Sequence, residues 1–268
     1  MATKKATKST KKSVNKAAST KTRVVKTASV APSRSGGSTM SDLPIAAWLA
    51  EFIGTFLLGA IIVATSGQPI FILFGLVTIV LTVGHLSGAH VNPAITFGAW
   101  VTRKISTVKA LGYIVAQVLG AMLAFVALNA LLGGTPGQAN PLTGGTQAPE
   151  LFRATQVATH KEWFAFFGSV LGLGIFGFAV ASALREKKEH FAQAFTVGGG
   201  LFLGLIIAGS TAILNPAVAV TLQAFSDLKG DNALAWALAI HVVAPLIGAA
   251  IGFVLYDLLR RDVDTSQS

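Results

Sequence analysis

The tripeptide Asn92-Pro93-Ala94 returns as Asn215-Pro216-Ala217, and each copy lies inside a long apolar stretch. Asn is a preferred residue at the N-cap of a helix, and Pro is preferred at the first helical position. Each copy therefore predicts a helix that begins in the middle of an apolar segment. Helices broken at membrane depth occur where protein or a water-filled cavity satisfies the freed backbone groups, so the two copies indicate a pore or transport site.

The composition is that of a membrane protein. The chain of 268 residues is 52% hydrophobic and 12% charged, has a mean hydropathy of +0.65 and contains no Cys, which excludes disulfides and thiolate chemistry. Six segments are long enough to cross about 30 Å of hydrocarbon, and we expect them at residues 44–66, 69–87, 107–132, 161–184, 193–213 and 232–259. Two shorter apolar pieces, 92–101 and 215–225, each open with Asn-Pro-Ala.

The order of these segments predicts an inverted repeat. Two spans, a half-helix and a third span occur over about residues 44–134 and again over about 160–260. Because each half has an odd number of spans, the second half is inverted, and the half-helices enter from opposite faces and meet near the middle. We expect an all-α membrane fold of six transmembrane helices and two half-helices over residues 42–262, with a pore within each subunit and a short C-terminal tail at 263–268.

Positive charge predicts the orientation of this fold. Residues 1–40 carry ten Lys and Arg and no acid, whereas the rest of the chain is neutral. If both termini are cytoplasmic, the Lys and Arg divide 18 inside to 3 outside, which obeys the positive-inside rule. Besides the tail, the inside group contains Arg103, Lys104, Lys109, Arg185, Lys187, Lys188, Arg260 and Arg261, and the outside group contains Arg153, Lys161 and Lys229.

The basic segment 1–41 is expected to be a disordered cytoplasmic tail, because it lacks aromatic residues and any sustained apolar run. Three interpretations stay open for it. It reinforces the topology, it attracts anionic lipid headgroups, or it binds nucleic acid or other polyanions through their phosphates.

The motifs resemble those of the aquaporin, or major intrinsic protein, family. Besides both Asn-Pro-Ala copies, the resemblance rests on residues 50–55 (AEFIGT), residues 84–91 (GHLSGAHV), Tyr113 with Ala116-Gln117, and Pro245 with Gly248-Ala249. It covers about residues 42–260. It implies a homotetramer in the lipid bilayer of the plasma membrane, with one pore per subunit for water and small neutral solutes. It also implies no metal, no cofactor and no covalent chemistry, so we expect no enzyme.

The resemblance implies roles for particular residues. Asn92 and Asn215 would donate amide hydrogens to a passing water and so interrupt a proton wire. Glu51 and Glu162 are acids inside apolar spans, where a functional role is the default. The matching acids of the family brace the half-helix loops, and we expect that role here. His90 would shape the cytoplasmic vestibule.

The expected selectivity filter departs from the family pattern. An Arg usually follows the second Asn-Pro-Ala, but Val218 stands there, and Ala219 replaces the Asp common in glycerol facilitators. Ungapped spacing gives the remaining filter positions as Ile72, Leu203 and Ala212, with Phe74 as the alternative to Ile72. Such a filter offers neither a cation nor side-chain donors to replace hydration. Glycerol, other polyols and dissolved gases therefore become candidate permeants beside water.

Two hypotheses of other classes stay open at this point. A secondary transporter also uses inverted repeats and broken helices, and it needs a central acidic or polar site, for which Glu51 and Glu162 are the candidates. The second hypothesis is a membrane-tethered polyanion binder that acts through residues 1–40. Deletion of residues 2–40 without effect on localisation or partners would remove it.

Overall fold

The computed structural model describes residues 44–133, 138–139, 146–147, 151–186, 189–226 and 232–266. The expected basic tail and three cations of the topology count, Lys187, Lys188 and Lys229, lie outside these ranges. Leu43–Ser268 form one compact unit.

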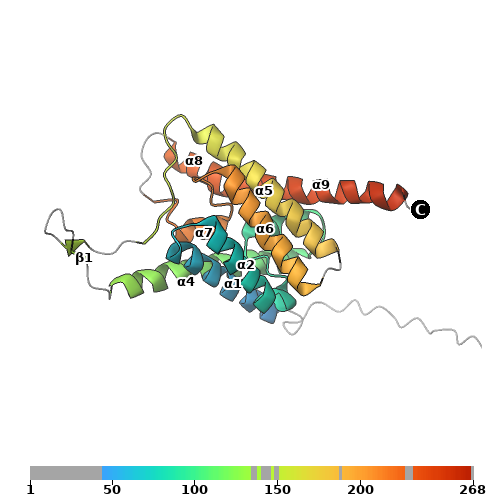
Figure 1. Ribbon diagram of the computed structural model, residues 1–268, viewed down its shortest axis with the longest axis horizontal. Coiled ribbons are helices and arrows are strands. Elements are labelled where there is room, and N and C mark those ends of the chain that lie inside the picture. The colour runs from blue at the N-terminus through green and yellow to red at the C-terminus, as the bar shows by residue number, and fades with distance from the viewer. Residues whose placement is uncertain are drawn as a thin grey trace, which may run out of the picture. The chain divides into compact units, whose positions relative to one another are not determined.

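Within the described residues, six helices are long and apolar enough to cross a membrane. Five of them are α1 (Ile45–Ala64), α2 (Pro69–Ser87), α4 (Thr107–Gly133), α5 (Glu162–Arg185) and α6 (His190–Ala208). The sixth joins α8 (Ala233–Leu238), the π-helical turn η2 (Ala239–Val243) and α9 (Ala244–Ser266). Two short helices, α3 (Pro93–Val101) and α7 (Pro216–Thr221), begin at the Pro of each Asn-Pro-Ala. The predicted fold class is confirmed (Figure 1).

Several element boundaries differ from the sequence-based expectation. Helix α6 ends at Ala208 rather than near 213, because Gly209 turns the chain with a φ of +87°. The second half-helix ends at Thr221, not near 225. Helix α9 continues to Ser266, so most of the expected tail at 263–268 is helical. The linker between the halves contains an unexpected antiparallel pair of two-residue strands, β1 (Gln138–Ala139) and β2 (Thr146–Gln147).

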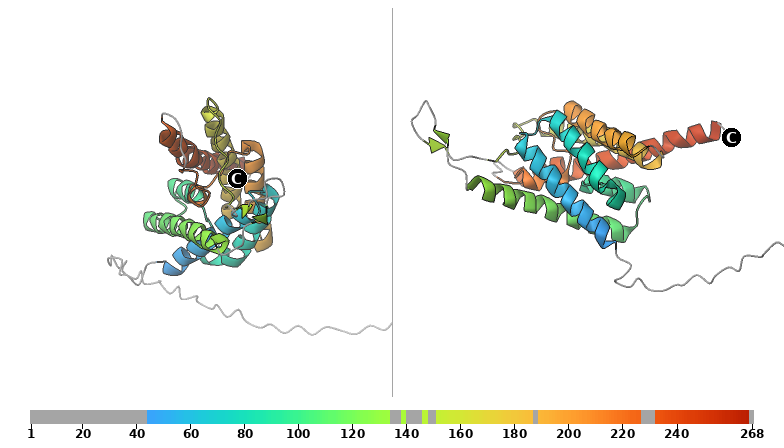
Figure 2. Two further views of the ribbon diagram at one scale, coloured as in Figure 1. Left: turned by 90° about the vertical axis from the view of Figure 1, so that its left-hand side faces the viewer. Right: turned by 60° about the horizontal axis from the view of Figure 1, so that its bottom comes forward.

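The two halves of the bundle are interlocked through their half-helices. Helix α1 packs on α2 and α4, and α5 packs on α6 and α9 in the same way. The half-helix α3 packs against α9 of the second half, and α7 packs against α4 of the first half. Figure 2 shows the first half, in blue to green, beside the second, in yellow to red. Each half-helix is therefore held partly by the half to which it does not belong.

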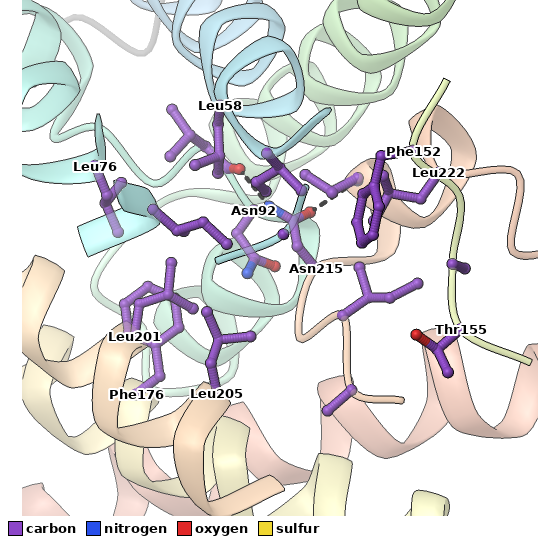
Figure 3. A pocket seen from close by; sticks show the side chains of 18 of the residues that line it. Leu58, Leu76, Asn92, Phe152, Thr155, Phe176, Leu201, Leu205, Asn215 and Leu222 are labelled. Carbon is purple, nitrogen blue, oxygen red and sulfur yellow. Dashed lines mark hydrogen bonds between the residues drawn. The ribbon is translucent and has the colours of Figure 1, made fainter. Parts of the chain in front are cut away.

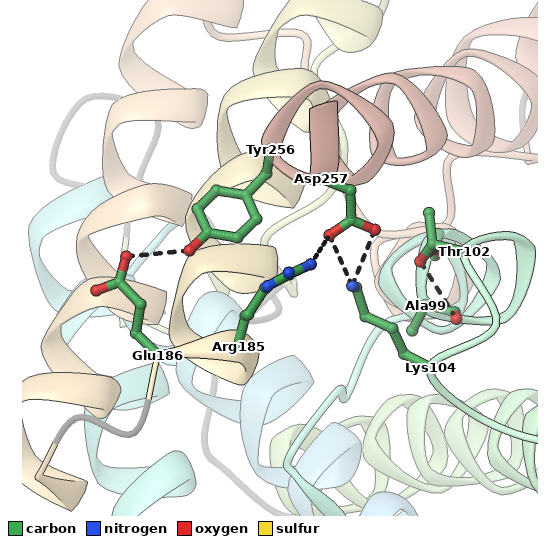
Figure 4. A network of polar contacts seen from close by, with 8 residues as sticks. Ala99, Thr102, Lys104, Arg185, Glu186, Tyr256 and Asp257 are labelled. Atoms are coloured by element: carbon green, nitrogen blue, oxygen red, sulfur yellow. Dashed lines mark hydrogen bonds and ion pairs between the residues drawn. The ribbon is translucent and has the colours of Figure 1, made fainter. Parts of the chain in front are cut away.

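A cluster of charged and polar side chains ties α3, α5 and α9 together at one end of the bundle (Figure 4). Lys104, just after α3, donates to both carboxylate oxygens of Asp257 on α9, at 2.9 and 3.0 Å. Arg185 at the end of α5 lies 3.5 Å from the same carboxylate. Beside them, the hydroxyl of Tyr256 donates to Glu186 at 3.0 Å. We call this the inner end, because Lys104 and Arg185 belong to the expected cytoplasmic cations.

Close helix packing relies on glycines at matching places of the two halves. A Cβ added to Gly120 on α4 would overlap the carbonyl oxygen of Phe52 on α1. A Cβ added to Gly248 on α9 would overlap the carbonyl oxygen of Val170 on α5 in the same way. Small residues let helix backbones approach closely in a membrane bundle. These two contacts therefore set the spacing of α1 with α4 and of α5 with α9.

We expect Gly120→Ala to lower the melting temperature of the purified protein in detergent, because the new methyl group meets a rigid backbone carbonyl. Overpacking of this kind costs about 1–3 kcal/mol. The matched control is Gly199→Ala on α6, where an added Cβ meets nothing within 4 Å. That change raises helix propensity by about 0.5–1 kcal/mol and leaves or improves the melting temperature. Equal shifts for both variants in a tryptophan-fluorescence melt would contradict this account of the packing.

Candidate functional site

The two Asn residues hold the half-helices together by a reciprocal exchange of hydrogen bonds. The amide nitrogen of Asn92 donates to the carbonyl oxygen of Leu214 at 2.8 Å, and that of Asn215 donates to the carbonyl oxygen of Val91, also at 2.8 Å. Each side-chain oxygen caps its own half-helix, since it accepts the backbone N–H of Ala94 or Ala217. An amide group carries two N–H donors. The second N–H of each Asn therefore remains after these bonds are made.

The residue before each Asn adopts a backbone conformation that is rare for its type. Val91 has a φ of +41° and Leu214 a φ of +57°. A left-handed conformation costs on the order of 1–3 kcal/mol at a residue with a side chain, and it persists where the surroundings determine it. At both positions the carbonyl oxygen accepts the Asn amide of the other half. The strain therefore directs these carbonyls across the pseudo-twofold axis.

Glu51 on α1 holds the loop before the first half-helix. Its carboxylate accepts the backbone N–H of His90 at 2.9 Å and that of Val91 at 2.6 Å. The side chain of Glu51 is completely buried, and the amide of Gln117 on α4 donates to it at 2.7 Å. The same amide also donates to the hydroxyl of Thr96 on α3 at 2.9 Å. A buried carboxylate requires such donors, and here they connect α1, α3, α4 and the loop.

His90 lies at the inner side of the Asn pair. Its Nδ1 is 3.2 Å from the hydroxyl oxygen of Thr96, and its ring packs edge-on against Tyr113 with the ring centres 5.3 Å apart. The imidazole is buried, with 4% of its surface exposed.

Glu162 does not occupy the position expected for a second brace. It is the first residue of α5, is only half-buried, and accepts the backbone N–H of His160 at 3.2 Å. A carboxylate in the first turn is favoured by the helix dipole. The described part of the structure shows no bond from Glu162 to the loop 209–214. The expectation that Glu162 braces this loop is therefore corrected: its carboxylate bonds to the backbone just before its own helix.

The true counterpart of Glu51 is Ser169, as the matching glycine contacts show. Gly54 lies three residues after Glu51 and contacts Val91, whereas Gly172 lies three residues after Ser169 and contacts Leu214. On the opposing helices, Gln117 precedes Gly120 by three residues, as Pro245 precedes Gly248. Both partners of the first brace are thus replaced together in the second half. Ser169 is buried all the same, with 1% of its surface exposed.

A cavity of about 70 Å³, counted as the space open to the centres of water molecules, lies beside the Asn pair between the two halves (Figure 3). Its wall is mainly apolar and draws on both halves: Leu58, Ile62, Ile72, Leu76, Phe176, Leu201, Leu205, Ala212, Val218 and Leu222. Polar groups come from His90, Asn92, Asn215, Thr155 and Ser210. Among the described residues that line the cavity, none is Asp, Glu, Lys or Arg.

The structure brings three of the four expected filter residues to this wall and corrects the fourth. Ile72 is buried in the wall together with Ala212 and Val218, whereas its alternative, Phe74, is 53% exposed. Leu203 is 52% exposed on the outward face of α6. Leu201 and Leu205, four residues apart on one helical face, line the cavity instead. Ungapped spacing along the sequence therefore reached the right part of α6, within two residues of Leu201 and Leu205, but chose a residue on the side of the helix that faces outward.

Helical periodicity within α6 could have corrected this position. Ala194, Val197, Gly198, Leu201 and Gly204 form its buried face, and Leu205 continues that face. Gln117 stood out in the sequence only as part of a family motif, and Thr96 only as a residue of the apolar piece 92–101. The sequence did not predict their hydrogen bonds, because these join helices that are far apart along the chain. Phe152, which also lines the cavity, lies in the linker and carries no helical pattern that points to it.

Two half-helices that meet by their N-termini inside six apolar helices define a multi-pass membrane protein built from an inverted repeat. The sequence profile of the major intrinsic protein family matches residues 38–256. The chain belongs to that family.

Individual relatives agree with this assignment. The chain is 34% identical to aquaporin TIP1-2 of Zea mays over 65% of its length and 63% of the relative's. It is 32% identical to a probable aquaporin TIP1-2 of Oryza sativa subsp. japonica, over 65% of its length and 64% of the relative's. The chain thus spans under two thirds of each of these plant relatives. A glycerol uptake facilitator protein-like 6 of Lactiplantibacillus plantarum is 30% identical over 76% of the chain and 93% of the relative.

A solved structure shows the same fold. The X-ray structure of the aquaglyceroporin from Plasmodium falciparum superposes with a TM-score of 0.65 at 21% identity. The match covers 83% of this chain and 99% of that one.

We expect Glu51→Gln to destabilise the protein, because an amide turns a donor toward backbone N–H groups that need acceptors. Each buried group left unsatisfied costs about 1–3 kcal/mol. The matched control is Glu162→Gln, whose effect stays within about 0.5 kcal/mol because that side chain is half-buried at a helix start. Thermal unfolding in detergent compares the two variants. A larger loss for the Glu162 variant would show that the wrong acid has been assigned to the loop.

Proposed function

We propose that this protein is a passive channel of the aquaporin type, which conducts water and small uncharged solutes and excludes ions and protons. The observation that carries the proposal is the reciprocal Asn pair beside an uncharged cavity. The cavity offers a path between the halves, and the described residues that line it provide no charged site at which an ion replaces its hydration. The path needs no covalent step, cofactor or metal.

The Asn pair supplies the barrier to protons. Each amide has one N–H left for a molecule in the cavity, so a passing water accepts from both Asn92 and Asn215. That water cannot also accept a hydrogen bond from its neighbour in the file, and a proton wire is interrupted there. The N-terminus of each half-helix adds part of a positive charge, up to roughly half an elementary charge for a longer helix. Cations, hydronium included, are repelled at the same point.

The apolar filter supports a permeant class wider than water. Ile72, Leu205, Ala212 and Val218 contribute side chains without donors or acceptors to the wall, to which Thr155 and Ser210 add two hydroxyl groups. Solutes that carry both apolar surface and hydroxyl groups lose less hydration free energy there than a strongly hydrated species does. A facilitator for glycerol-like solutes or dissolved gases with low water flux is therefore the second candidate function. The named glycerol uptake facilitator among the relatives is in keeping with it.

The contacts of the two acids argue against a secondary transporter. Glu51 is engaged by His90, Val91 and Gln117, and neither Glu51 nor Glu162 lines the central cavity. A coupled transporter needs a group that takes up and releases an ion along the substrate path. A saturable flux driven by a proton or sodium gradient would nevertheless favour the transporter.

We further propose a homotetramer in the plasma membrane with both termini in the cytoplasm. The cations Lys104 and Arg185 meet at the inner end, whereas Phe152, next to Arg153, lies against the α1–α2 turn at the opposite end, which we call the outer end. This separation supports the positive-inside orientation. The basic tail would then face the anionic lipids of the cytoplasmic leaflet. The exposed apolar side chains of the long helices suit lipid and neighbouring subunits.

The proposed function is tested by stopped-flow light scattering on proteoliposomes that contain the full chain. Water and glycerol fluxes should exceed those of protein-free liposomes, while a pH-sensitive dye inside the vesicles reports no added proton flux. Permeation that fails to exceed the lipid background would overturn the proposal. Glycerol flux without water flux would select the second candidate.

We expect Val218→Arg to lower glycerol permeability relative to water by about tenfold or more, because a guanidinium narrows the path and adds donors that replace water's hydration. Val218→Met is the control, since it adds length without charge. If only the Arg variant gains selectivity for water over glycerol, the charge of the side chain causes the gain. If both variants gain it, the narrower path causes it. Unchanged water and glycerol fluxes in both variants would show that Val218 is not part of the filter.

The two leucines of α6 test the corrected filter position. Leu205→Ala removes a side chain from the cavity wall, so we expect it to raise glycerol permeability in the same liposome assay. Leu203→Ala removes an identical side chain from the outward face, so the flux should stay at the unsubstituted value. A stronger effect of the Leu203 variant would restore the position obtained by ungapped spacing.

A further inference from the structure

The linker between the two halves contributes an aromatic ring to the outer end of the cavity. Phe152 lies ten residues before Glu162, the first residue of α5, is half-buried, and lines the cavity. Figure 3 shows it beside Leu222. The backbone N–H of Ala154 donates to the carbonyl oxygen of Leu222 at 2.8 Å. This bond fixes the linker to the end of α7 two residues after the ring.

The ring of Phe152 packs against Gly67, in the turn between α1 and α2. A Cβ added to Gly67 would lie 2.7 Å from both Cε1 and Cζ of Phe152, so the ring edge occupies the space that a side chain would fill. Gly67 also has a φ of +71°, a conformation that side chains disfavour. Its N–H donates to the carbonyl oxygen of Ile62, another residue of the cavity wall, at 2.8 Å. Two requirements thus converge on glycine at this position.

The aromatic ring of Phe152 differs from the proposed filter residues, whose side chains are all aliphatic. Ile72, Leu205, Ala212 and Val218 provide no flat, rigid group at the outer end. Phe176, the other phenylalanine of the described wall, lies beside Leu201 and apart from Phe152 (Figure 3). An aromatic side chain has few rotatable bonds and is held here on two sides, by the Gly67 turn and by the anchored linker. It therefore limits the opening by shape without adding charge.

We propose that Phe152 is the residue that sets the size limit for solutes at the outer mouth of the channel. This inference rests on the proposed function, since it needs a conducting cavity. The linker thereby takes part in selectivity, and the mouth is formed by both the membrane helices and the segment that joins the two halves. Polyols longer than glycerol are the class that such a limit excludes.

The experiment compares water, glycerol and erythritol fluxes in proteoliposomes of the full chain. Phe152→Ala should raise erythritol permeability relative to water by about tenfold, the scale at which a small change of a hydrophobic opening discriminates solutes. Phe152→Trp, with a larger ring, should lower glycerol permeability relative to water. Phe164→Ala is the matched control, because Phe164 is 74% exposed and lies outside the wall of this cavity.

The outcomes separate the two proposals. If the unsubstituted protein conducts and both Phe152 variants keep its permeability ratios at equal protein content, the inference about Phe152 is overturned while the channel stands. If the unsubstituted protein shows no flux above protein-free liposomes, the proposed function fails and the inference fails with it. Should Phe152→Ala not reconstitute, the Trp variant decides, since a ratio equal to that of the unsubstituted protein contradicts the size limit.

Discussion

The exchange of hydrogen bonds between Asn92 and Asn215 is the constraint on which the rest of the structure depends. Each amide caps its own half-helix with its oxygen and holds a carbonyl of the other half with its nitrogen. In hydrocarbon an unsatisfied backbone group costs several kcal/mol, so neither half-helix can begin at membrane depth without the other. The same bonds leave one N–H of each Asn beside the cavity, so the element that stabilises the fold also places donors on the cavity wall.

The two halves satisfy this constraint by different means. The first loop is fixed by a buried carboxylate on α1 that also accepts from Gln117 on α4, whereas the second has Ser169 and Pro245 at the matching places. Removal of an acid together with its amide partner leaves no buried charge unpaired, which is far less costly than removal of either one. The inverted repeat is therefore symmetric in its backbone and glycine contacts but asymmetric in its buried polar groups.

The sequence predicted the fold well because its signals were local. Apolar length gave the six spans, and Asn-Pro gave the start of α3 and α7 to the residue. The errors arose where three-dimensional contacts decide. Glu162 looked like a second brace because it lies near the start of an apolar span, but its place along α5 is wrong for the loop. Leu203 was placed by distance along the chain, whereas the rotation of α6 turns it outward.

The shape of the cavity depends on packing at a distance from its wall. The rotation of α6 determines that Leu201 and Leu205 face the cavity. Gly204 fixes that rotation, since a Cβ there would lie 2.6 Å from the carbonyl oxygen of Gly172 on α5. Gly172 in turn contacts Leu214, whose carbonyl receives the amide of Asn92. A continuous set of contacts thus links the apolar wall of the cavity to the Asn pair.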